Sequence, residues 1–134
     1  MSKIVSFSEA SSIAIHAVVI IASSKKPITV NAIAEQTGAS ENHLAKVMQI
    51  LVKHDIVSST RGPAGGFILN KPPENITLLD IYECIEGKIT SEGCPLNRSV
   101  CPFKKCIMSG IVQNLTHEIK VYLAEQKVSN LIDI

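Results

Sequence analysis

The stretch Ile56–Asn70 reads IVSSTRGPAGGFILN, and the interpretation of the whole fold depends on it. Its two ends, 56–60 and 67–70, are rich in β-branched and large apolar residues that favour strands. Between them lie an arginine, a proline and three glycines, a composition typical of a turn. The stretch therefore predicts a β-hairpin with Arg61 at the base of its tip. The alternative is an ordinary surface hairpin with a solvated arginine.

Two short helices are expected immediately before this hairpin. The first spans Thr29–Thr37, is capped by Thr29 and stops at Gly38; the second runs from its cap Ser40 to about His54. Apolar residues of the second helix recur at the spacing of one buried face. These residues are Leu44, Val47, Met48, Leu51 and Val52. Such a pair is a helix-turn-helix, which also occurs in proteins that do not bind DNA. Followed at once by a hairpin, it predicts a winged helix.

Three further helices complete the expected fold. An apolar helix over 7–23, capped by Ser6 or Ser8, should be buried on more than one side. A fourth helix, Leu78–Glu86, is capped by Thr77. A long final helix should run from Ile107 to about Glu125, with an apolar stripe at Ile111, Leu115, Ile119 and Tyr122. One small domain cannot easily bury this stripe, so we expect a dimer interface, the alternative being packing on its own domain.

The expected fold class is therefore mainly α with a small β-hairpin wing. Residues 1–86 form the winged helix-turn-helix, 87–106 a cysteine-containing loop, and 107–134 the dimerisation helix and tail, within a single compact domain. Hydrophobic residues make up 46% of the 134 residues and aromatic residues 4%, which favours a core of Ile, Val, Leu and Ala. Seven basic and four acidic residues lie in 1–71, a mild basic excess that suits contact with phosphates.

The apolar run Ile13–Ala22 raises the question of membrane insertion. It is too short to span a bilayer, and no basic segment of the kind found in signal peptides precedes it. We therefore expect a cytoplasmic protein with no membrane contact. In that compartment thiols stay reduced, so clustered cysteines are more often metal-binding or redox-active than disulfide-bonded.

Three of the four cysteines, Cys94, Cys101 and Cys106, are separated by six and then four residues. This spacing differs from the paired C-x-x-C of zinc sites. Thiolates are the usual ligands of iron–sulfur clusters, and nearby basic residues would favour the thiolate form. A labile cluster, direct oxidation or alkylation of the thiols, and zinc or a passive loop all remain open. The fourth cysteine, Cys84, lies inside a helix and is interpreted as a small buried apolar residue.

The chain resembles the IscR/NsrR-type winged-helix regulators of the Rrf2 family. The resemblance rests on IAEQTG at 33–38, followed by Ser40 and Leu44, and on VSSTRGPAGGF at 57–67. It continues with LLDIY at 78–82 and the loop with three cysteines, so that it covers essentially the whole chain. The resemblance implies a dimeric, sequence-specific bacterial transcription regulator that often carries a 2Fe–2S or 4Fe–4S cluster.

Site residues follow from this resemblance. It implies that Cys94, Cys101 and Cys106 are the cluster ligands. Some relatives place a histidine where this chain has Ser109, a poor iron ligand, and others use the first helix of the partner. The fourth-ligand candidates are therefore His16, which could equally be a core histidine, and Glu9. The implied DNA contacts are Ser40, Asn42, His43 and Lys46 in the third helix, with Arg61, Gly62, Pro63 and Gly65 in the wing.

The expected function is a homodimeric repressor that binds a pseudo-palindromic double-stranded DNA operator and is switched by an iron–sulfur cluster. One alternative is the same regulator sensing redox state or electrophiles directly through its thiols. A more remote alternative is an adaptor that binds protein through the winged helix. An enzyme is not expected: the glycine-rich tip lacks the lysine-serine pattern of a phosphate loop, and no base is placed beside a nucleophile.

Overall fold

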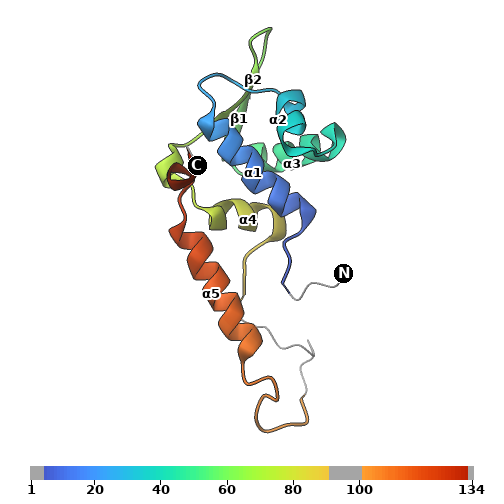
Figure 1. Cartoon of the computed structure of the whole chain (residues 1–134), viewed down its shortest axis with the longest axis vertical. Coiled ribbons are helices and arrows are strands. Elements are labelled where there is room, and N and C mark those ends of the chain that lie inside the picture. Colours follow the sequence, from blue (N-terminus) through green and yellow to red (C-terminus); the bar gives the residue numbers. More distant parts are fainter. Residues whose placement is uncertain (1–4, 91–100, 133–134) are drawn as a thin grey trace.

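The computed structural model of the protein describes residues 5–90 and 101–132. Figure 1 shows mostly helical structure with one two-stranded antiparallel hairpin, which confirms the expected fold class. The elements are α1 (Glu9–Ser23), α2 (Val30–Thr37), α3 (Glu41–Lys53), β1 (Val57–Thr60), β2 (Gly66–Leu69), η1 (Pro73–Asn75), α4 (Leu78–Glu86), α5 (Ile111–Glu125) and η2 (Val128–Leu131). None of the described helices is both long enough and apolar enough to cross a bilayer.

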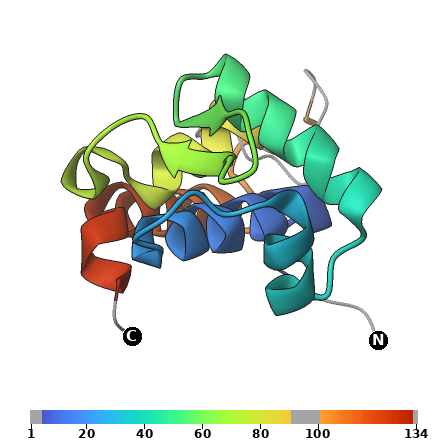
Figure 2. The same ribbon diagram turned by 90° about the horizontal axis from the view of Figure 1, so that it is seen from above.

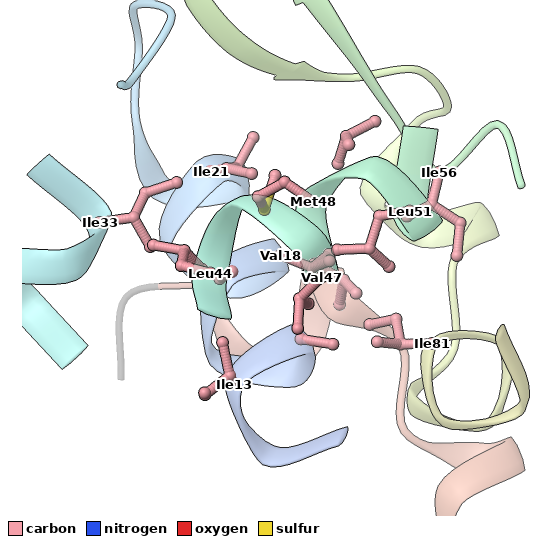
Figure 3. Packing of buried hydrophobic residues seen from close by; sticks show 14 of the residues in the cluster. Ile13, Val18, Ile21, Ile33, Leu44, Val47, Met48, Leu51, Ile56 and Ile81 are labelled. Atoms are coloured by element: carbon pink, nitrogen blue, oxygen red, sulfur yellow. The ribbon is translucent and has the colours of Figure 1, made fainter. Parts of the chain in front are cut away.

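Helix α1 runs through the middle of the molecule and packs against α2, α3, α4 and β2 (Figure 1). Its buried side interlocks with the apolar side of α3, as Figure 3 shows for Val18 of α1 and for Leu44 and Met48 of α3. Branched aliphatic side chains dominate this core, as the low aromatic content predicts. On the opposite side of α1 His16 is exposed, whereas its neighbours Ser12, Ile15, Val19 and Ile20 are half-buried.

The helix starts follow the predicted caps. The backbone N–H groups of Ala32, His43 and Asp80 donate to the hydroxyls of Thr29, Ser40 and Thr77, at 3.2, 3.1 and 3.1 Å. Ser8 caps α1 in the same way through the N–H of Ser11 at 3.1 Å, and the helix therefore begins at Glu9 and not at residue 7. Gly38 ends α2 with a φ of 74°, a left-handed conformation that glycine adopts without strain.

The predicted start of the final helix was wrong. Helix α5 begins at Ile111, four residues after the expected Ile107. The reason is local: Ser109 (φ 55°) and Gly110 (φ 71°) both take left-handed conformations, which cannot continue a right-handed helix. Residues 107–110 form a turn instead.

The tail after α5 returns to the beginning of α4. The N–H of Val128 donates to Ile76 O at 2.8 Å, and the N–H of Leu78 donates to Gln126 O at 2.9 Å. Val128 and Leu123 are buried in the core. These contacts hold the C-terminal end of α5 on the winged helix, while its other end extends away from the core (Figure 1).

The hairpin is paired with register Val57↔Leu69 to Thr60↔Gly66, and it gains a further partner from the loop before α2. Ile28 and Phe67 exchange backbone hydrogen bonds of 3.2 and 2.8 Å. This close approach depends on Gly66: a Cβ built there would lie 2.7 Å from the backbone C and O of Ile28.

Gly66→Ala is therefore expected to push the hairpin away from Ile28 and to lower the free energy of unfolding by about 1–3 kcal/mol. Urea unfolding followed by circular dichroism measures the change. The matched control is Ser59→Ala on the exposed side of β1, which should stay within about 0.5 kcal/mol of wild type. Equal stability of Gly66→Ala and wild type would show that the hairpin does not need this approach.

Candidate functional site

Helix α3 presents a polar face opposite its buried one. Ser40, Asn42 and Lys46 are exposed at or near the start of this helix, and His43 is half-buried between the two faces. The hydroxyl of Ser40 accepts the N–H of His43 and keeps its own proton for an outside acceptor. The backbone N–H groups of the first turn of α3 and the partial positive charge at this end of the helix also favour an anion.

The hairpin tip displays Arg61, Gly62 and Pro63 to solvent. Gly62 has a φ of 102° and nothing within 4 Å of a Cβ built on it, so its outer side is open. Gly65 is half-buried in the same tip, and its expected DNA contact stays a prediction. Its N–H donates to Gly62 O at 2.9 Å, and a Cβ there would lie 2.5 Å from Thr60 O. Gly65 therefore closes the tip turn.

These two elements share one side of the molecule. Figure 2, seen from above, shows the hairpin and α3 next to each other on the side nearest the viewer, and α3 contacts β1. The structure thus places the eight expected DNA-contacting residues in a helix face and a loop tip: Ser40, Asn42, His43, Lys46, Arg61, Gly62, Pro63 and Gly65.

Two of the three clustered cysteines, Cys101 and Cys106, are exposed on the segment that precedes α5, and Cys94 lies outside the described residues. Hydrogen bonds from the backbone N–H of Gly110, and then of Met108 and Ser109, lower the pKa of the Cys106 thiol and outweigh the small opposing effect of burial. The turn at 107–110 that delayed α5 therefore also favours the thiolate at Cys106.

Cys84 behaves as the sequence indicated. It is half-buried in α4 and packs against the core. Burial raises the pKa of its thiol, and the neighbouring Asp80 carboxylate raises it further. This thiol is therefore held in its neutral form.

The candidate fourth ligands lie on α1, whereas the segment that carries Cys101 and Cys106 lies beyond the far end of α5 (Figure 1). His16 is exposed and is not a core histidine. Its Nδ1 lies 2.6 Å from the carbonyl oxygen of Ser12, so Nδ1 carries the proton and Nε2 is available. Glu9 is also exposed. Within residues 5–90 and 101–132, no three His, Cys, Asp or Glu side chains gather as a metal site.

A surface that the sequence indicated only in part lies along α5. Ile111, Leu115 and Tyr122 are 49%, 39% and 57% exposed, whereas Ile119 of the expected stripe turns inward against the core. Beside them an almost entirely apolar groove of about 470 Å³ separates α5 from α1. Its walls include Phe7, Ile15, His16, Ile119 and Tyr122.

Comparison with known proteins gives a consistent result. The model of the Rrf2 family, described as "Iron-dependent Transcriptional regulator", matches residues 7–134. The helix-turn-helix protein YwgB of Bacillus subtilis is 29% identical over 79% of this chain and 69% of its own length. The transcriptional regulator IscR of Photorhabdus laumondii is 24% identical over 83% of this chain and 68% of its own length. The structure of CymR, the global cysteine regulator of B. subtilis, has a TM-score of 0.80, covers 96% of both chains and is 22% identical.

The two thiols predict different alkylation profiles in reduced, iron-free protein. Because the pKa of Cys106 is lowered and that of Cys84 is raised, Cys106 should become reactive at a lower pH than Cys84. Iodoacetamide labelling over a pH series, read peptide by peptide with mass spectrometry, gives the two midpoints. In urea the midpoints should converge, since both shifts depend on the fold. Coincident midpoints in the native protein would contradict the assignment.

Proposed function

The chain belongs to the Rrf2 family of transcriptional regulators, and we propose that it is a homodimeric, sequence-specific DNA-binding repressor controlled by its cysteine loop. The observation that carries the proposal is the shared side on which α3 and the hairpin tip lie (Figure 2). A helix for the major groove and a basic tip for the adjacent backbone or minor groove are the two elements a winged helix uses.

Each exposed residue of this side has a definite chemical role in the proposed complex. The amide of Asn42 is suited to the edge of a base, and Lys46 to a guanine or a phosphate. Ser40 and the first turn of α3 offer O–H and N–H donors to a phosphate oxygen. Arg61 lies at the base of an open, glycine-containing tip and reaches a phosphate or the minor groove.

A dimer would place two such reading surfaces on a pseudo-palindromic operator. The exposed Ile111, Leu115 and Tyr122 of α5 supply an apolar surface for a second copy. The groove between α1 and α5 continues this surface and includes His16. In such a dimer the partner's α5 and its preceding cysteine segment would approach this groove, which is the arrangement that a fourth ligand from α1 requires.

The residues present suit an iron–sulfur cluster as far as they are described. Thiolate is the ligand form of cysteine, Cys101 and Cys106 are both exposed, and the backbone around Cys106 stabilises its thiolate. Cys94 is the proposed third ligand, and His16 or Glu9 of the partner the fourth. A bound cluster could change its oxidation state or be lost and rebuilt, and the cysteines of this chain would hold it beside α5.

Regulation requires that the protein with an intact cluster and the protein without it bind DNA with different affinities. Residues 87–110, which include the expected loop 88–105, join α4, which packs on the winged helix, to α5, the proposed dimer helix. A change in the order of these residues would therefore alter how the two reading surfaces are spaced.

Direct thiol sensing is the second candidate, and Cys106 favours it. An exposed thiol with a lowered pKa is the form that oxidants and electrophiles attack. In this version the same loop and the same DNA interface operate without a metal.

Protein purified without oxygen distinguishes these candidates. A visible absorption band with bound iron, lost in Cys101→Ser and Cys106→Ser but kept in the control Cys84→Ala, is expected for the cluster. Fluorescence anisotropy should then show different affinities for operator DNA with and without iron. Colourless, iron-free protein whose DNA affinity changes on thiol oxidation would favour the second candidate. If the affinity for DNA did not fall as the salt concentration rises, DNA recognition would be contradicted and a protein-binding adaptor favoured.

The dimer is tested by placing a charge on α5. Tyr122→Lys puts an ammonium group in the proposed apolar interface and should shift the sedimentation coefficient towards that of a monomer. His117→Lys, an exposed polar position on the same helix, is the matched control and should remain dimeric. If wild type sediments as a monomer at high concentration, the proposed interface is wrong.

A further inference from the structure

We infer that the segment Ser24–Ile28, between α1 and α2, is a third DNA-contacting element, whose Lys25 and Lys26 hold backbone phosphates beside the wing. The inference rests on the proposed function, because it assigns further positioning residues to the same interface. Neither lysine belongs to the helix-turn-helix or to the hairpin from which the interface was expected.

The segment Ser24–Ile28 is joined to the wing by backbone pairing. Ile28 pairs with Phe67 through two backbone hydrogen bonds, so the chain before α2 lies along β2 like the start of a third strand. Gly66 removes the one Cβ that would keep the two backbones apart. A DNA backbone that runs along β2 would therefore pass close to residues 24–28.

Local hydrogen bonds hold the segment in one conformation without DNA. The Ser24 hydroxyl donates to Lys26 O at 2.6 Å, and the N–H of Ser24 donates to Ile21 O at 3.2 Å. Pro27 then restricts the backbone between the lysines and the hairpin. A preordered loop loses less conformational entropy on binding, so its cations contribute more to affinity.

The lysine side chains of this segment are placed to meet phosphates. Lys25 and Lys26 are exposed. Together with Pro27, Ile68 and Leu69 they line a shallow hollow of about 180 Å³ at the base of the hairpin. The apolar side chains of Pro27, Ile68 and Leu69 in this hollow can support the methylene stem of a lysine while its ammonium group stays in solvent. The two positive charges are therefore presented next to the wing.

Figure 2 places the segment relative to the other two elements. Seen from above, the blue chain that joins α1 to α2 runs along one edge of the hairpin, and α3 lies along the opposite edge. The lysines of this segment would therefore extend the footprint on DNA past the wing. Phosphates carry no sequence information, and these contacts should position the protein without changing which sequence it prefers.

The test is the double variant Lys25→Gln/Lys26→Gln. Its matched control is Lys88→Gln/Lys120→Gln, which removes the same charge from exposed positions after α4 and on α5. Binding is measured by fluorescence anisotropy over a salt series, on a duplex selected by the wild-type protein from a random pool and on an unrelated duplex. Sedimentation and thermal unfolding check that both variants keep the wild-type assembly and fold.

The plot of log affinity against log salt concentration has a negative slope. Its steepness should decrease by about 0.9 for each phosphate that the variant no longer neutralises. Four lysines per dimer would therefore lower the steepness by up to about 3.6 units. The affinities for the selected and the unrelated duplex should decrease by the same factor, so that the ratio of the two affinities stays at its wild-type value. An unchanged slope, or an equal decrease in the control, overturns the inference while wild-type binding upholds the proposed function. Wild-type protein that binds neither duplex overturns both.

Discussion

The burial of α1 is the contact on which the rest of the structure depends. Helices α2, α3 and α4 and strand β2 all pack on it, so one helix fixes the positions of both α3 and the hairpin. Val18 and Ile21 are almost fully enclosed, and each such side chain contributes about 1.5–3 kcal/mol. Ala14 and Ala17 are completely buried as well. Because these side chains are small, neighbouring backbones can pack closely against α1, and a core poor in aromatic residues can then be tightly packed.

The same packing leaves α5 attached at one end only. Leu123 and the pairing of the tail with the start of α4 hold its C-terminal end, while Ile111 and Leu115 near its beginning remain exposed. The cysteine segment joins α5 at this less anchored end. In the proposed regulator, chemistry at the thiols therefore acts on the part of the helix that the core restrains least. The proposed surface for a second copy lies on the same helix, so a change at the thiols would reach that surface through α5.

Much of the fold could be predicted because its signals are local. The caps at Thr29, Ser40 and Thr77 and the stop at Gly38 each depend on a few neighbouring residues. The hairpin followed from one short stretch in the same way. The start of α5 was missed because Ser109 takes a left-handed conformation that its residue type seldom adopts. The apolar spacing around it fits a helix, so nothing in the pattern reveals the break.

By itself, then, the sequence determined which segments become helices and strands, the polar face of α3, and the three closely spaced cysteines. Only the tertiary structure decided that Ile28 joins the hairpin, that His16 faces away from the core, and that Ile119 turns inward while Tyr122 stays exposed. The physical reason is that propensity and periodicity act over one or two turns of chain. These outcomes depend on which distant surfaces meet, and the packing of α1 settles that.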